Sequence, residues 1–193
     1  MTSRDVPTEL AEHVALAERV SELLPDIRAI GVRLIDVYEG GGRLFTFGNG
    51  GSAADAQHLA AELVGRFRRE RRPLPAVALS VDPSVVTAIG NDYSFGDLFA
   101  RQVQAFVQEG DMVIGFTTSG RSANVVKGLA AARERGATAV LFGGGDGSPA
   151  ADHADYALVV PSATTARVQE MHLLLMHLLL EQVDAWAAGE AQE

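Results

Sequence analysis

The chain has 193 residues, about the length of one domain, and 47% of them are apolar, as in an ordinary globular protein. It contains no cysteine, which excludes disulfides, zinc–thiolate sites and thiol catalysis. A net charge of −9, with Lys127 as the lone lysine, argues against a binder of long nucleic acids. The first residues lack the basic and apolar segments of a signal peptide, and no run of about 18 apolar residues follows. We therefore expect one cytoplasmic domain without a membrane span.

The first part of the chain, residues 1–40, is predicted to be helical. Apolar side chains recur at three- and four-residue spacings over 8–39, which is the period of a helix with one apolar face. Pro25 is expected to break or kink this region, because its ring clashes inside a helix. The glycines at 40–42 are expected to end it.

From residue 41 onward, short apolar strands alternate with helices. Strands are predicted at 43–47, 75–79, 111–116, 137–142 and 156–160, and helices at 53–67, shortly after 84, from about 122 to 135 and over 164–187. Continuous apolar strands in this order indicate βαβ units and a parallel sheet covered on both faces. Residues 41–193 are thus predicted to form the core of a three-layer α/β/α sandwich, in a single domain with the N-terminal helices.

The last predicted helix is apolar nearly all round between Val168 and Leu180. A helix on the surface of a monomer would carry one apolar stripe only. Two interpretations remain: the helix packs partly against another subunit, or it is buried in the centre of the domain. We favour a homo-oligomer.

Two polar loops follow predicted strands, where open α/β sheets bind their ligands. Residues 48–52 (Gly-Asn-Gly-Gly-Ser) open one helix, and residues 117–122 (Thr-Thr-Ser-Gly-Arg-Ser) open another. Glycines allow close backbone approach, and the start of a helix offers free N–H groups to an anion. Such residues also cap helices for their own sake. Because two such loops occur, we predict a phosphate site, although neither loop matches a nucleotide-binding motif.

His58 and Glu62 lie four residues apart on the predicted helix 53–67, so both side chains occupy one face. A histidine and a carboxylate at this spacing can share a divalent metal or act as an acid–base pair, although a hydrogen-bonded surface pair is the more common case. Arg66 continues the same face one step further. It is expected to pair with Glu62 or to meet substrate oxygens.

The last helix carries Gln169, His172 and His177. At about 100° per residue, the two histidines point about 140° apart, so one site is not expected to use both. Gln169 and His177 lie about 12 Å apart along the helix axis. They can meet one metal only at full stretch. Three explanations of this separation remain open. The helix is irregular near Gln169, the two residues contact different parts of one ligand, or the two side chains at one site come from different subunits.

Three further segments have simpler interpretations. Asn91 and Asp92 form a turn or bind sugar hydroxyls. The glycine-rich segment 143–147 is predicted to be a turn. The arginine-rich segment 66–72 is predicted to be a solvated helix end rather than a nucleic-acid patch, because cations suit the C-terminal end of a helix.

At these motifs the chain resembles the phosphoheptose (sedoheptulose 7-phosphate) isomerases of the sugar-isomerase (SIS) domain superfamily. The resemblance extends from the N-terminal helices to about Asp184. It is carried by Gly48–Leu63, Ala88–Tyr93, Thr117–Val125 and Ala166–His172, in the same order and spacing. It implies an SIS-type sandwich, a homotetramer with active sites at subunit interfaces, and one zinc ion per subunit. The implied reaction interconverts sedoheptulose 7-phosphate and D-glycero-D-manno-heptose 7-phosphate.

The resemblance also implies roles for single residues. Glu62 and His177 match the proton-transfer residues, and His58, Glu62, Gln169 and His177 match the zinc ligands. Matches to substrate contacts are Asn49, Gly50, Gly51, Ser52, Glu62, Arg66, Asn91, Asp92, Thr117, Thr118, Ser119, Ser122 and Gln169.

The sequence departs from the family pattern at a few positions. Thr117 stands where many members have serine, Ala166 where some carry an acid, and Arg121 where asparagine is common.

Three other functions are weighed against the isomerase: a non-catalytic scaffold of the type that associates with a replication initiator, a sugar-phosphate sensor domain, and an isomerase of another sugar phosphate. The scaffold relative lacks the acid and the final histidine, whereas Glu62 and His177 are both present here.

Overall fold

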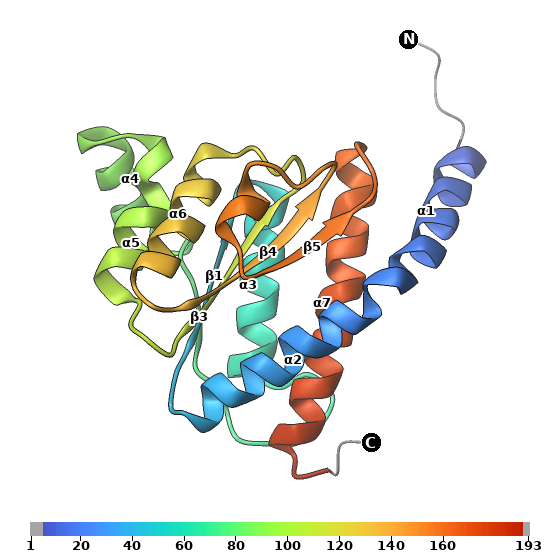
Figure 1. Cartoon of the computed structure of the whole chain (residues 1–193), viewed down its shortest axis with the longest axis horizontal. Helices are drawn as coiled ribbons and strands as arrows, with labels where there is room; N and C mark the ends of the chain where they lie inside the picture. Colours follow the sequence, from blue (N-terminus) through green and yellow to red (C-terminus); the bar gives the residue numbers. More distant parts are fainter. Residues whose placement is uncertain (1–5, 191–193) are drawn as a thin grey trace.

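Strands and helices alternate along the chain as the sequence predicts (Figure 1). The computed structural model describes residues 6–190. Its elements are α1 (Val6–Val20), η1 (Ser21–Leu23), α2 (Leu24–Glu39), β1 (Leu44–Gly48), α3 (Gly51–Val64), β2 (Ala76–Ala78), α4 (Pro83–Asp92), η2 (Phe95–Asp97), α5 (Leu98–Phe106), β3 (Met112–Thr117), α6 (Ala123–Glu134), β4 (Thr138–Gly144), η3 (Ala150–His153), β5 (Tyr156–Val160) and α7 (Thr165–Ala187), where η marks short 3₁₀ helices.

All the strands run parallel in one sheet of order β2-β1-β3-β4-β5. The chain leaves β1 toward β2 on one side and returns to β3 on the other, so the strand order reverses between β1 and β3. Ligands of open α/β sheets bind beyond the carboxyl ends of the strands at such a reversal. The register pairs Gly48 with Phe116, which places the two polar loops side by side at this edge.

The sheet separates two apolar cores, because successive side chains of a strand point to opposite faces. Leu44 of β1 belongs to the core covered by α1, α2, α3 and α7, whereas the next residue, Phe45, belongs to the core covered by α4, α5 and α6. Figure 1 shows these two helical layers on either side of the strands. The predicted three-layer sandwich is confirmed.

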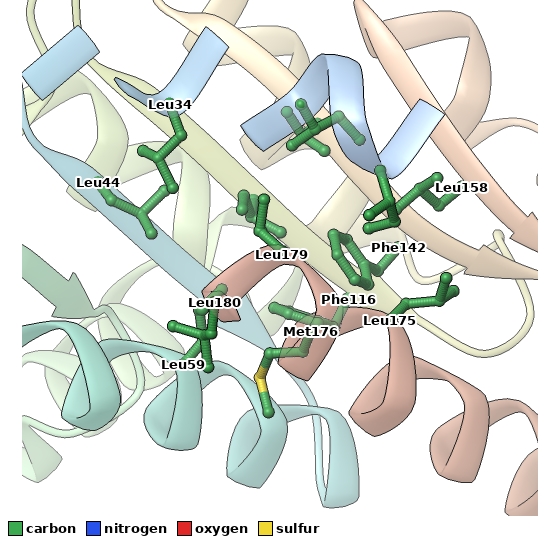
Figure 2. Close-up of a cluster of buried hydrophobic side chains, with 14 of the residues drawn as sticks. Leu34, Leu44, Leu59, Phe116, Phe142, Leu158, Leu175, Met176, Leu179 and Leu180 are labelled. Carbon is green, nitrogen blue, oxygen red and sulfur yellow. The ribbon is translucent and has the colours of Figure 1, made fainter. Parts of the chain in front are cut away.

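Helices α3 and α7 pack side by side on the first face. Figure 2 shows Leu59 of α3 beside Met176 and Leu180 of α7, and all three side chains are buried. The buried side of α7 is continuous, while Leu173, Leu174 and Leu178 remain partly exposed on its other side. Within residues 6–190, no helix has the length and apolar character needed to cross a bilayer.

Some predicted boundaries move. Pro25 does interrupt the N-terminal helices, since it occupies the first turn of α2, where its missing N–H has no helical role. The helix predicted at 53–67 is α3, which ends at Val64 because Gly65 follows. Helix α5, Leu98–Phe106, is an element that the sequence reading did not predict. The segment predicted as a turn at 143–147 begins inside β4 and turns only from Gly145.

Candidate functional site

The loop after β1 leaves the start of α3 without a side-chain cap. Gly50 is the N-cap residue at φ 57°, a left-handed conformation that favours glycine, and no side chain hydrogen-bonds to the first turn. Ser52 is buried in that turn. A Cβ on Gly51 would overlap with the side-chain amide of Gln169, so a larger residue here would require that amide to move. The N–H groups of Ser52 and Ala53 donate to the backbone carbonyls of Asn49 and Gly50, and the positive end of the helix dipole faces an anion here without a side-chain cap.

The loop after β3 gathers hydroxyl groups in front of α6. The Thr117 Oγ1 lies 3.1 Å from the Ser122 Oγ and 3.5 Å from the Ser119 Oγ. Ser122 is the N-cap residue of α6, yet it makes no side-chain capping bond. By contrast, Asp82 caps α4 fully, because its carboxylate accepts from the backbone N–H groups of Ser84 and Val85. The hydroxyls before α6 therefore contact one another instead of capping the helix, and they could exchange these contacts for oxygen atoms of a phosphate.

A reciprocal amide pair joins the two loops. The Asn49 Nδ2 donates to the Asn124 Oδ1 over 2.8 Å, and the Asn124 Nδ2 donates back to the Asn49 Oδ1 over 2.8 Å. Asn124 lies in the first turn of α6 and is 3% exposed. Sequence reasoning missed this residue. Its signals in the sequence are its place two residues after the hydroxyl loop and within the Thr117–Val125 motif.

His58, Glu62 and His177 converge from α3 and α7. The His58 Nε2 lies 3.2 Å from the Glu62 Oε1, which confirms their shared helical face. The His58 and His177 rings meet edge to face with centroids 5.3 Å apart, and Phe67 stacks on the other side of His177 at 5.5 Å. Burial lowers the pKa of the His177 imidazole and His58 lowers it further, against the opposing effect of Glu62. The neutral ring, which can accept a proton, is thereby favoured.

The fit of a metal depends on the donors in this cluster. Two imidazoles and a carboxylate are donor types that zinc accepts. Among residues 6–190, however, no three histidine, cysteine, aspartate or glutamate side chains lie close enough together to hold an ion. Gln169 lies beside Gly51, and α7 is unbroken between it and His177, so the separation of about 12 Å along the axis stands.

His172 and His177 point to different environments, as their spacing predicts. His172 is fully buried, and its Nε2 lies 3.0 Å from the carbonyl oxygen of Gly143. Its ring meets those of Phe116 and Phe142 edge-on. His172 is therefore a core residue and takes no part in the site.

Other predicted site residues lie apart from this centre. The expected pairing of Arg66 with Glu62 is wrong: α3 ends before Arg66, whose guanidinium is exposed and lies 3.9 Å from the Glu70 carboxylate. Asn91 and Asp92 are the last residues of α4, exposed and hydrogen-bonded to each other over 2.8 Å. No hydrogen bond in the described part of the chain joins them to either loop. Arg121 turns away from the hydroxyls to Asp146, at 2.7 Å.

The far end of α3 is fixed by a buried ion pair that the sequence reading missed. The Arg71 Nε donates to the Asp184 Oδ1 over 3.0 Å, and both side chains are almost fully buried. Arg71 also donates to the carbonyl oxygens of Glu62 and Leu63. Asp184 accepts the backbone N–H groups of Arg68 and Arg69. The segment 65–72 is thus a folded connection held at the end of α7. Phe67 belongs to this segment and stacks on His177.

Asp55 is a further titratable group that sequence reasoning passed over. It lies one turn before His58 on α3, and its Oδ2 is buried without a hydrogen-bond partner. Burial raises the pKa of Asp55 to about 6, against the opposing effect of His58.

Comparisons with known proteins agree with this geometry. The SIS domain family profile matches residues 10–144. The phosphoheptose isomerase of Aquifex aeolicus is 49% identical over 171 residues, covering 89% of this chain and 88% of the relative. That of Geobacter metallireducens is 48% identical over 183 residues, covering 94% and 97%. The solved phosphoheptose isomerase of Neisseria gonorrhoeae superposes with a TM-score of 0.88 at 38% identity, covering 93% of this chain and 97% of that one. The chain belongs to the SIS domain family and, within it, to the phosphoheptose isomerases.

Proposed function

We propose that the chain interconverts sedoheptulose 7-phosphate and D-glycero-D-manno-heptose 7-phosphate as an aldose–ketose isomerase. The relatives' shared name supports the substrate class. One observation carries the proposal. The starts of α3 and α6, whose N-cap residues make no side-chain capping bond, meet at the reversal of strand order, and Glu62 and His177 lie on the adjacent helices α3 and α7. This arrangement offers an anchor for a phosphate and proton-transfer groups for the opposite end of an opened sugar.

The chemistry requires one carbon-bound proton to move. In the ketose-to-aldose direction, Glu62 removes a proton from C1, and the electron pair forms the C1–C2 double bond of an enediol. The same carboxyl group returns the proton to C2. His177, whose neutral ring is favoured, moves the hydroxyl proton from the oxygen on C1 to the oxygen on C2. General acid–base steps of this kind contribute about 10²–10⁴-fold each.

We also propose one zinc ion per subunit, for which His58, Glu62 and His177 would supply the donors once the three side chains draw closer together, because in their present positions they form no group that could hold an ion. Their donor types support it, and a bound zinc ion would supply Lewis-acid polarisation of the sugar oxygens. The fourth predicted ligand, Gln169, stays a prediction, because its amide lies beside Gly51 in this structure.

A homotetramer is the proposed assembly. The partly exposed Leu173, Leu174 and Leu178 on α7 support an interface, as do Val6 and Leu10 on α1, which are more than half exposed. Light scattering of the purified chain tests this directly. A monomer at micromolar concentration would contradict it.

The reaction is tested by giving the purified protein sedoheptulose 7-phosphate and following the sugar by NMR, with and without chelator. An aldoheptose 7-phosphate that disappears with chelator and returns with zinc supports both the reaction and the metal. Turnover that survives full removal of metal supports the isomerase reaction and contradicts the proposed zinc ion. Absence of turnover with zinc supplied, while the sugar phosphate still binds, contradicts the proposed reaction.

A further inference from the structure

The amide pair between Asn49 and Asn124 uses both polar atoms of each side chain. The Asn124 Oδ1 also accepts the backbone N–H of Val125 at 3.0 Å. Asn124 is almost completely buried, whereas Asn49 is half-buried on the loop that follows β1. Asn124 is therefore withdrawn from solvent and from any substrate. Asn49 keeps one amide hydrogen and one lone pair for another partner.

The pair connects two loops with different tasks. Asn49 belongs to the loop that opens α3, and Asn124 follows the hydroxyl loop that opens α6. Neither N-cap residue, Gly50 or Ser122, makes a side-chain capping bond, and in the first turn of α6 the Val125 N–H is taken by the Asn124 side chain. Besides the pairing of the neighbouring strands β1 and β3, the two amide bonds are the polar connection between these loops in the described residues.

We propose that Asn124 is a positioning residue that sets the orientation of the Asn49 amide toward the sugar. This inference rests on the proposed function. The phosphate group that the hydroxyl loop binds and the sugar that Asn49 contacts belong to one substrate molecule. The distance between the two loops must therefore match the length of that substrate. Asn124 fixes that distance and allows only one of the two flipped orientations of the Asn49 amide.

Helix capping alone does not account for Asn124. A role limited to the Val125 N–H needs only an acceptor, which an aspartate also supplies. The reciprocal pair needs a donor and an acceptor on the same planar group, which an amide supplies and a carboxylate does not. The Asn124→Asp change keeps size and the bond to Val125, but it places two acceptors opposite the Asn49 amide, so that one of them faces the Asn49 Oδ1 whichever way that amide is turned.

The experiment measures steady-state isomerisation of sedoheptulose 7-phosphate by wild type, Asn124→Asp, Asn49→Ala and the double variant. Inhibition by inorganic phosphate is measured for each protein, as a readout of phosphate binding that does not involve the sugar. Gln102→Glu is the matched control. Gln102 is another buried amide, bonded to the Leu98 carbonyl within α5, and no hydrogen bond in the described part of the chain joins it to Asn49. Thermal unfolding verifies that each variant is folded, and Asn124→Ala replaces Asn124→Asp if the latter is not.

We expect Asn124→Asp to lower kcat/KM by about tenfold or more, because an unpaired buried acceptor carries a full desolvation penalty. Inhibition by phosphate stays unchanged within about twofold. The double variant is no worse than Asn49→Ala alone, because a residue that acts through Asn49 has nothing left to position. Gln102→Glu leaves kcat/KM within about twofold of wild type.

Three results would overturn the inference. Asn124→Asp could retain full kcat/KM, its loss could multiply with that of Asn49→Ala, or inhibition by phosphate could weaken in parallel with kcat/KM. The wild-type assay separates these failures from a failure of the proposed function. If the wild type shows no turnover, both the proposed reaction and the role of Asn124 are contradicted. If the wild type turns over normally and Asn124→Asp has the same kcat/KM, only the role of Asn124 is contradicted.

Discussion

The two ends of α3 satisfy their backbone groups in opposite ways. At its start, Gly50 leaves the first N–H groups without a side-chain cap, and the Gln169 amide of α7 lies against Gly51. At its end, the buried Arg71 donates to the last carbonyls and is held in turn by Asp184 of α7. Both ends lie against the same neighbouring helix, so the difference comes from the side chains and not from the packing.

This contrast separates binding from support. Backbone donors that no side chain uses are available to a ligand, whereas carbonyls that a buried guanidinium uses are fixed. Glu62 lies near the supported end, one turn from His58, while Asn49 and Ser52 lie at the open end. Changes at the open end should therefore affect substrate affinity, and changes near the supported end should affect turnover or folding.

The largest expected effect comes from Glu62→Gln. The amide cannot take a proton from carbon, so we expect kcat to fall by about 10²–10⁴-fold. Inhibition by inorganic phosphate should not change, because the open end is untouched. Steady-state kinetics measure both quantities. Glu134→Gln, the same change on the exposed side of α6, is the control. Unchanged turnover of Glu62→Gln would remove this residue from proton transfer, and weaker phosphate binding would contradict the separation of the two ends.

The supported end is tested by Asp184→Asn. Removing one charge of a buried ion pair typically costs about 3–5 kcal/mol, so we expect a loss of that order in the free energy of unfolding. The control is Asp97→Asn, whose partner Lys127 is exposed and for which a much smaller loss is expected. Urea unfolding measures both variants. Equal losses would mean that Asp184 and Arg71 are no more important than a surface pair.

The same carboxylate also predicts a pH dependence. Burial by itself would raise the pKa of Asp184, but the backbone N–H groups of Arg69 and Arg68 and the Arg71 guanidinium lower it below the usual 3.8. A carboxyl group with a lowered pKa in the folded state stabilises the protein above its usual pKa, and this contribution is lost as the pH falls through the folded value. Unfolding measured below about pH 4 should show this loss in wild type and not in Asp184→Asn.

His172 provides a test in a different pH range. Burial lowers its pKa from 6.5 to about 4, against a hydrogen bond to the Gly143 carbonyl that raises it. The unfolded chain therefore binds an extra proton between these values, and the free energy of unfolding should fall by about 3 kcal/mol as the pH decreases from 6.5 to 4. His172→Phe should remove this contribution, whatever its effect at neutral pH, while other groups that titrate in this range, such as Asp55, keep theirs. Urea unfolding at several pH values measures the slope for both proteins, and equal slopes in wild type and variant would contradict the assignment.

Local patterns in the sequence predict most of the fold. The apolar runs locate every strand of the sheet to within about two residues, because a strand buried on both faces requires a continuous apolar segment. Helix α5 was not predicted because its segment is short and follows directly on the η2 turn. The end of α3 was placed too late, since it depends on Arg71, which folds back from a later segment.

The candidate site is predictable only in part, for the same reason. The glycine and hydroxyl loops and the His58–Glu62 pair are each contained in one short segment. The Asn49–Asn124 pair and the Arg71–Asp184 pair join segments far apart in the chain, so spacing along the sequence carries no signal of them. Buried polar residues that act between elements become visible only when the elements are placed in space.

The smallest expected effect concerns Arg121, a charge that the sequence places beside the hydroxyl loop. In the structure its guanidinium pairs with Asp146, and both side chains are more than 60% exposed. An exposed pair of this kind contributes about 0–1 kcal/mol, and water screens its charge from the loop. Arg121→Ala should therefore change the KM for sedoheptulose 7-phosphate by less than about twofold at 150 mM salt, where the Debye length is about 8 Å. A larger rise in KM, growing as the salt concentration is lowered, would show that Arg121 leaves Asp146 for the phosphate. The phosphate would then be bound by the Arg121 guanidinium as well as by the open end of α3. The contrast between an end that binds through its backbone and an end that is supported by side chains would no longer hold.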